Sequence, residues 1–139
     1  EKGVRICVED LYDITEECML EAWERLLGKY PPEFLGICYD TGHANMLWRD
    51  RAPQVVDKYK DRMYAVHLHD NFGATDAHLI PWEAQIDWEQ VIKVIGKSAY
   101  EGPLILEVGC HDKDMDVFLG RAYEAGCRLN EMLRKVREA

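Results

Sequence analysis

The sequence predicts an α/β protein in which helices cover a parallel sheet. Short apolar segments rich in Val, Ile and Leu alternate with longer segments that have the spacing of amphipathic helices. The apolar segments are almost continuously hydrophobic, which is typical of parallel strands that are buried on both faces. Four such pairs follow one another, and each apolar segment ends in an acidic residue or a histidine. We therefore expect one domain of four βα units over residues 1–139.

Caps and prolines mark the first two units. Thr15 suits the N-cap of the first helix, because its hydroxyl can accept a bond from a free backbone N–H, and Gly28 is typical of a helix end. The second strand follows Pro31 and Pro32, and the helical region behind it is less regular, with Pro53 able to begin its second part. We expect strands at residues 3–9 and 34–40 and helices at residues 15–30 and 45–60.

A long loop at residues 71–86, which contains Gly73 and Pro81, follows the third strand. Asp87 suits the N-cap of the third helix, whose apolar residues recur at helical spacing. The last helix is acidic at its start and basic near its end, which suits the helix dipole. We expect strands at residues 62–70 and 102–109 and helices at residues 87–100 and 114–137.

Composition narrows the class of protein. A chain of 139 residues has room for one domain with a real core, and its net charge of −9 argues against a broad basic surface for nucleic acid. The five cysteines include no C-x-x-C pair, which favours a reduced, cytoplasmic protein without a disulfide framework. No apolar run approaches the roughly 20 residues of a membrane span, and no signal-peptide pattern is visible. We expect a soluble protein with no membrane partner.

Potential metal ligands stand where the four expected strands end. In parallel α/β architectures the carboxyl ends of the strands lie at one edge, so residues far apart in sequence can converge there on one ion. Three carboxylates and one imidazole favour a divalent ion of intermediate hardness, namely Mn²⁺, Co²⁺, Mg²⁺ or Zn²⁺. The alternative is four solvated residues at the starts of loops. The candidates are Glu9, Asp40, His67 and Glu107.

Several segments together resemble the C-terminal half of the xylose-isomerase-like TIM barrels. That superfamily includes sugar and sugar-phosphate isomerases and epimerases, inosose dehydratases, hydroxypyruvate isomerases and endonuclease IV. The resemblance covers essentially the whole chain and implies strands five to eight of a (β/α)8 barrel, that is, a (βα)4 half-barrel. The segments are YDTGHAN at residues 39–45, VHLHDN at 66–71, DAHLIP at 76–81, IDW at 86–88 and YEGPLILEV at 100–108.

The resemblance implies a role for each residue at a strand end. Glu9, Asp40, His67 and Glu107 would bind the metal ion. Glu9 and Glu107 would also flank the substrate, one removing a proton and the other returning one through a metal-stabilised enediolate. His69 points to the same face of a regular strand as His67 but matches no ligand position, so we expect it to have a supporting role.

Residues of the neighbouring loops match further functional positions. His43 corresponds to a histidine that contacts substrate in the epimerases or a further zinc in the endonucleases. Asp76 and His78 match a D-x-H pair that helps to hold an additional zinc in the endonucleases and that many isomerases keep. Where the family commonly has P-G-E-G, residues 81–84 read P-W-E-A. We therefore expect Trp82 either to face a different substrate or to pack at the base of the loop.

These features favour a divalent-metal-dependent sugar or sugar-phosphate isomerase or epimerase that acts on a small sugar or polyol. The alternatives are a metal-dependent dehydratase of a cyclic polyol or keto-acid, a non-catalytic half-barrel, and an endonuclease IV-like hydrolase, which the acidic balance disfavours. A whole barrel takes roughly 250 residues, and this chain opens on a strand-like segment without an initiator Met. We expect a fragment of a longer enzyme, then a half-barrel completed by self-association, then a short gene product. Activity is expected of the complete barrel more than of this chain alone.

Overall fold

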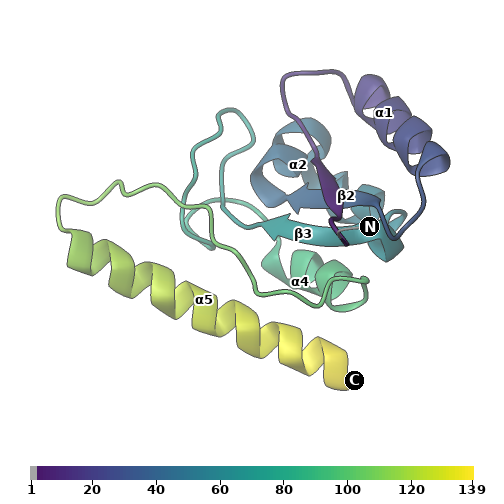
Figure 1. Cartoon of the computed structure of the whole chain (residues 1–139). Helices are drawn as coiled ribbons and strands as arrows, with labels where there is room; N and C mark the ends of the chain where they lie inside the picture. The colour runs from purple at the N-terminus through teal and green to yellow at the C-terminus, as the bar shows by residue number, and fades with distance from the viewer. Residues whose placement is uncertain (1–2) are drawn as a thin grey trace.

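A three-stranded parallel sheet forms the centre of the fold. The computed structural model describes residues 3–139, and Figure 1 shows the sheet with helices packed around it. The strands lie side by side in chain order, with β2 in the middle, and their register places Asp40 opposite His67. The strands are β1 (Ile6–Glu9), β2 (Leu35–Asp40) and β3 (Met63–His67). The α/β class expected from the sequence is confirmed.

The helices occupy the connections between strands and the C-terminal region. Figure 1 shows the long last helix running beneath α4, and these two helices pack together. Two short 3₁₀ turns, at Arg49–Arg51 and Lys60–Arg62, interrupt the connection between β2 and β3. The helices are α1 (Glu16–Lys29), α2 (Thr41–Trp48), α3 (Ala52–Asp57), α4 (Trp88–Gly96) and α5 (Met115–Glu138).

The expected caps of the helices are present. The Thr15 hydroxyl accepts a bond from a backbone N–H of α1, and the Asp87 carboxylate accepts two from the first turn of α4. Pro53 lies in the first turn of α3, where its missing N–H removes no helical bond. Helix α1 ends at Lys29 and not at Gly28, because the backbone N–H of Tyr30 still bonds to a carbonyl of the last turn.

The second helical region begins earlier than expected. Asp40 is both the last residue of β2 and the N-cap of α2, and its Oδ1 accepts a bond from the backbone N–H of His43 at 2.9 Å. The helix therefore starts at Thr41 instead of near residue 45. It ends at Trp48, because the C-cap residue Arg49 has a φ of 57°, which is incompatible with a right-handed helix. Because the helix starts directly at the strand end, His43 is held close to the site.

The fourth expected strand is reduced to one bridge. Residues 102–109 run parallel to the chain after β3, where Leu68 pairs with Leu106. The Leu68 N–H donates to the Ile105 carbonyl, and the Glu107 N–H donates to the Leu68 carbonyl. With no further strand on its outer side in the part of the chain that the structure describes, this segment does not form a longer ladder, and Ile105 stays 44% exposed.

A hydrophobic core lies between the sheet and the helices, but two edges remain apolar and exposed. Trp23, Trp48 and Trp88 are fully buried in this core. At the β1 edge, Val4 is 65% exposed, and on α5 the ring of Tyr123 is 74% exposed. Beside α5, a cavity of about 540 Å³ is lined largely by apolar side chains of residues 103–106 and of the helix.

Among residues 3–139, no helix combines the length and the apolar character that crossing a membrane requires.

Candidate metal centre

The four expected ligands come together at one edge of the sheet. Three of them end β1, β2 and β3, and the fourth lies in the extended segment bridged to Leu68. Parallel strands end at the same edge, which is why residues from four units of the sequence can meet. Their ligand atoms all lie within 4.8 Å of one another: Glu9, Asp40, His67 and Glu107.

His67 lies among the three carboxylates. Its Nδ1 is 2.9 Å from Glu9 Oε1, 2.9 Å from Glu107 Oε2 and 3.8 Å from Asp40 Oδ2. Asp40 Oδ2 is buried and has no hydrogen-bond partner among the described residues. Three acidic groups around one imidazole nitrogen repel one another unless positive charge lies between them. This donor set, with an unpartnered buried oxygen directed at it, fits a divalent ion.

Asp40 is held in its ionised form. Burial alone would raise the pKa of its carboxyl, but contacts with His69 and His43 outweigh burial and keep that pKa below its ordinary value. One of these contacts is the helix cap described above. The other is with His69 Nε2, which lies 2.9 Å from Asp40 Oδ1, although the ring N–H is not aligned with that oxygen as in a regular hydrogen bond.

Asp10 is a site residue that the sequence did not reveal. It has no exposed surface, and its Oδ1 accepts a bond from the backbone N–H of Asp40 at 2.8 Å. Burial, reinforced by the negative charges of Asp40 and Glu9, raises the pKa of the Asp10 carboxyl well above its ordinary value. Its position beside Glu9 is visible in the sequence, but its contact with β2 depends on the parallel pairing.

A second cluster adjoins the first and contains His43, Asp76 and His78. His43 Nδ1 lies 2.8 Å from the carbonyl of Asp10, and His78 Nδ1 lies 2.7 Å from the carbonyl of Glu107. A carbonyl only accepts, so each Nδ1 carries a proton and each Nε2 of a neutral ring has a lone pair. Both Nε2 atoms are directed at Asp76 Oδ2, at 3.4 Å and 3.0 Å. Lone pairs facing a carboxylate oxygen need a proton, a hydroxyl or a cation between them.

The protonation of His78 follows from its neighbours. Burial alone would lower the pKa of this ring, but the bond to the carbonyl of Glu107 and the charge of Asp76 outweigh burial and raise the pKa above its ordinary value. A proton on Nε2 can therefore satisfy the contact with Asp76 when nothing else is bound. A cation or a hydroxyl donor at this position would compete with that proton.

His69 lies between the two clusters. Its Nε2 is 2.9 Å from Asp40 Oδ1 and 3.6 Å from Asp76 Oδ1. Its ring stacks on that of His78, with the ring centroids 4.1 Å apart. His69 is fully buried and contacts one carboxylate of each cluster. It therefore lies at the centre of the candidate site, although it matches no ligand position of the family.

Trp82 does not lie with the other expected substrate residues. Its ring is under the guanidinium of Arg128 on α5, with 3.9 Å between Cζ and the ring centroid, and beside Trp88. Its φ of 73° is in the left-handed region, which is why the family's glycine at this position makes physical sense. Of the two alternatives, packing at the base of the loop agrees with this placement.

Asp70 organises the loop that carries the second cluster. It is fully buried, and its two carboxylate oxygens accept bonds from several donors. These bonds connect the end of the third strand region to the segment 82–88 and so hold both ends of the long loop together. The donors are the backbone N–H groups of Asn71, Trp82, Ala84 and Ile86 and the indole N–H of Trp88.

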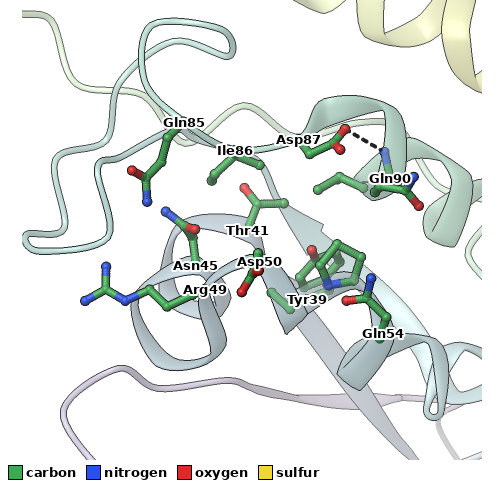
Figure 2. Close-up of a pocket in the computed structure, with 13 residues that line it drawn as sticks. Tyr39, Thr41, Asn45, Arg49, Asp50, Gln54, Gln85, Ile86, Asp87 and Gln90 are labelled. Carbon is green, nitrogen blue, oxygen red and sulfur yellow. Dashed lines mark hydrogen bonds between the residues drawn. The ribbon is translucent and has the colours of Figure 1, made fainter.

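A separate cavity of about 530 Å³ lies on the other side of β2 (Figure 2). Tyr39 and Thr41 line it, and Figure 2 shows Gln85 and Asn45 at one end and Gln54 and Gln90 at the other. Side chains alternate along a strand, so Tyr39 and Asp40 point to opposite faces. The cavity is therefore on the helix side and is distinct from the carboxylate cluster.

Comparison with known proteins gives one family and several relatives. The family model described as xylose isomerase-like TIM barrel matches residues 1–136. The uncharacterized protein y4fM of Sinorhizobium fredii (strain NBRC 101917 / NGR234) is 34% identical over 140 residues, covering 99% of this chain and 45% of that protein. The uncharacterized protein MJ1311 of Methanocaldococcus jannaschii is 30% identical over 114 residues, covering 76% of this chain and 37% of that protein.

Two solved structures have a similar fold. One, described as a D-tagatose 3-epimerase-like protein, has a TM-score of 0.72 and 27% identity. The match covers 98% of this chain and 49% of that protein's chain. The other, the TTHB071 protein from Thermus thermophilus soaked with ZnCl2, has a TM-score of 0.59 and 19% identity. The match covers 94% of this chain and 45% of that protein's chain. At that identity the second shows the fold alone. The chain spans about half the length of these relatives or less.

Proposed function

The chain belongs to the xylose isomerase-like TIM barrel family, and on this premise we propose that it is the metal-binding half of a sugar or sugar-phosphate isomerase or epimerase. The observation that carries the proposal is the convergence of three carboxylates and one imidazole from three strand ends and the bridged segment 102–109. The likeness to a structure described as epimerase-like, at 27% identity, supports the same class of reaction.

The ion would be held by the first cluster, namely Glu9, Asp40, His67 and Glu107. A divalent ion supplies positive charge that stabilises the negative charge developing on a carbonyl oxygen when the neighbouring carbon loses a proton. Asp40 is suited to a binding role, because its low pKa keeps it ionised and its Oδ2 lacks another partner among residues 3–139. Mn²⁺, Co²⁺, Mg²⁺ and Zn²⁺ all fit this donor set.

Glu9 and Glu107 would move the proton. Their carboxylates each lie 2.9 Å from His67 Nδ1, and their side chains are 34% and 46% exposed, so a substrate can reach them. One carboxylate takes a proton from the carbon beside the carbonyl, and the other returns a proton to the opposite face of that carbon or to its neighbour. Return to the same carbon gives epimerisation. Return to the former carbonyl carbon gives isomerisation, in which the hydroxyl on the deprotonated carbon loses its proton and the former carbonyl oxygen gains one.

His43, Asp76 and His78 would bind the hydroxyl groups of the substrate. A hydroxyl can donate to a bare Nε2 lone pair and accept from a protonated one, so this cluster suits a polyhydroxylated ligand. The same geometry is the one observation that favours an additional ion, as in an endonuclease IV-like hydrolase. The number of ions bound per chain separates the two: one ion supports the hydroxyl role, and two support the additional ion.

The exposed apolar edges would be covered by four further βα units. The outer edge of β1 lies at one end of the half-barrel, and the apolar side of α5 lies at the other end. These are the two ends at which the remaining units of a closed barrel would join. The relatives are about twice as long as this chain or more. The added units would be the other half of a longer protein or a second copy of this chain. The five free cysteines fit a reduced, cytoplasmic setting.

Metal titration and solvent exchange test this proposal. We expect Co²⁺ to bind the chain, and Asp40→Asn to weaken that binding by more than the roughly 100-fold upper range for an outer-shell partner, because an amide cannot replace the charge of a ligand carboxylate. With a panel of ketoses in D₂O, deuterium should enter the carbon beside the carbonyl, as NMR detects. Glu107→Gln should abolish exchange and Glu101→Gln, on an exposed carboxyl of the same segment, should not.

Two results would overturn the proposal. A folded chain that binds no Co²⁺ has no metal centre of the kind inferred from the four ligands. A product that has lost water, instead of a sugar that has gained deuterium, would assign the site to a dehydratase.

A further inference from the structure

His69 is a fully buried ionisable group that matches no ligand position in the family. It has no exposed surface, and neither ring nitrogen makes a regular hydrogen bond among the described residues. Burying a polar ring without such partners is unfavourable, so the fold must gain something else by keeping it. Its neighbours indicate what that is.

The backbone of His69 is fixed by Thr41. The Thr41 hydroxyl donates to the carbonyl of His69 at 2.8 Å, and the N–H of His69 donates to the same hydroxyl oxygen at 3.0 Å. Thr41 is itself the first residue of α2 and directly follows Asp40. The strand-end residue and the buried histidine are therefore held in a fixed relation.

Gly42 leaves room for the ring. A Cβ at this position would overlap Cε1, Nδ1 and Nε2 of His69. The φ of Gly42 is not in the left-handed region, so the glycine is required by this close approach and not by backbone conformation. Residues 41 and 42 of the D-T-G-H segment thus both serve to place His69.

The ring then acts on Asp40. The Oδ1 of Asp40 has two nitrogen neighbours, the backbone N–H of His43 at 2.9 Å and Nε2 of His69 at 2.9 Å. Both nitrogens lie against the same oxygen, and Oδ2 is left facing His67 without a hydrogen-bond partner among residues 3–139. Stacking on His78 holds the other side of the ring.

We propose that His69 is a positioning residue that fixes the Asp40 carboxylate with Oδ2 directed at the ion and thereby sets the affinity of the centre. The inference rests on the proposed function, because it concerns the same ion. Groups that orient a ligand in this way typically change metal affinity about 10–100-fold when they are removed. His69 itself need not contact the ion.

Three variants and a control test the role in Co²⁺ titrations. His69→Leu removes the contact with Asp40 and should weaken binding about 10–100-fold. His69→Gln keeps an N–H donor of similar reach and should retain most of the affinity, which a purely space-filling role would not explain. Gly42→Ala displaces the ring without removing a polar group and should weaken binding as His69→Leu does. The control, Lys97→Leu, changes an exposed residue at the C-cap of α4 that belongs to neither cluster.

A measurement without metal separates this inference from the proposed function. Long-range ¹H–¹⁵N spectra report which ring nitrogen carries the proton, and we expect Nε2–H for His69, since Nε2 faces Asp40. An Nδ1–H tautomer overturns the positioning role, and so does a folded His69→Leu chain whose Co²⁺ affinity is within about twofold of wild type. Failure of the wild-type chain to bind Co²⁺ refutes the proposed function, and the tautomer then decides whether His69 supports Asp40. If His69→Leu does not fold, His69→Gln and Gly42→Ala decide.

Discussion

At the scale of the residue, several side chains of the centre use one polar atom to bond the backbone, which leaves their other polar atom to face the site. The Nδ1 atoms of His43 and His78 face backbone carbonyls, so their Nε2 atoms are directed at Asp76. Asp40 uses Oδ1 for the cap of α2 and leaves Oδ2. Engaging one atom of a side chain fixes the direction of the remaining atom, which is what a metal or substrate site requires.

Asp10 gives a prediction about pH. Its pKa in the folded chain is raised, so the folded state binds this proton more tightly than the unfolded state does. The resulting stabilisation is complete below the unfolded pKa of about 3.9 and is lost as pH rises toward the folded value. Asp10→Asn cannot ionise but keeps an oxygen to accept from the N–H of Asp40.

We expect Asp10→Asn to raise the thermal midpoint of the metal-free chain by about 3 °C or more at pH 8, a shift that corresponds to roughly 1 kcal/mol. The gain should shrink as pH falls toward 4. Scanning calorimetry at several pH values measures both. A midpoint that falls, or a gain that is independent of pH, would show that Asp10 is not held protonated in the folded state.

At the scale of the element, short connections carry the site. Helix α2 begins directly at the end of β2, which keeps His43 within one turn of Asp40. The long loop after β3 is held at both ends by Asp70, and a backbone pair between Asp70 and Leu79 closes its middle part. The loop is thus fixed before any ligand binds, although it contains no helix or longer strand of its own.

Asp70→Asn tests the importance of this loop. An amide replaces one accepting oxygen by a donor, so backbone N–H groups of the segment 82–86 would lose their acceptor while remaining partly buried. We expect the free energy of unfolding to fall by about 3 kcal/mol and amide exchange to rise at residues 82, 84 and 86. Denaturant titration and hydrogen exchange measure the two effects.

The matched control is Asp57→Asn, on a half-exposed carboxylate paired with Lys60. A surface pair of this kind contributes little, and the change in stability should stay within about 0.5 kcal/mol. Equal effects of the two substitutions would mean that the bonds to Asp70 do not hold the loop.

At the scale of the whole molecule, the chain forms a sector of a barrel with two open sides. The last extended segment pairs through a single bridge, and the apolar face of α5 has no covering element among residues 3–139. Exposed sheet edges and apolar faces favour association. The four candidate ligands do not depend on these sides, because all four lie within one sector.

Completion of the barrel by a second copy predicts a change in size. If two copies pair, light scattering should give twice the mass of the chain, and Tyr123→Glu on α5 or Ile6→Lys on the β1 edge should return it to a monomer. Lys58→Glu, at an exposed position on the C-cap of α3, should have no effect. A monomer that stays folded and soluble at high concentration would instead indicate that the edges are covered only within a longer protein.

The sequence alone determined the class of fold and the helix caps, and it predicted the four candidate ligands that the structure brings together. These follow from local chemistry, since apolar runs, cap residues and the last residue of a strand can be recognised without knowing what they pack against. Tertiary structure alone decided the start of α2 at Thr41, the single bridge in place of a fourth strand and the position of Trp82 against α5. It also decided the contacts of Asp10, His69 and Asp70. Each of these depends on which atoms of distant segments come within bonding distance, and that is fixed by strand register and packing, which no short stretch of sequence contains.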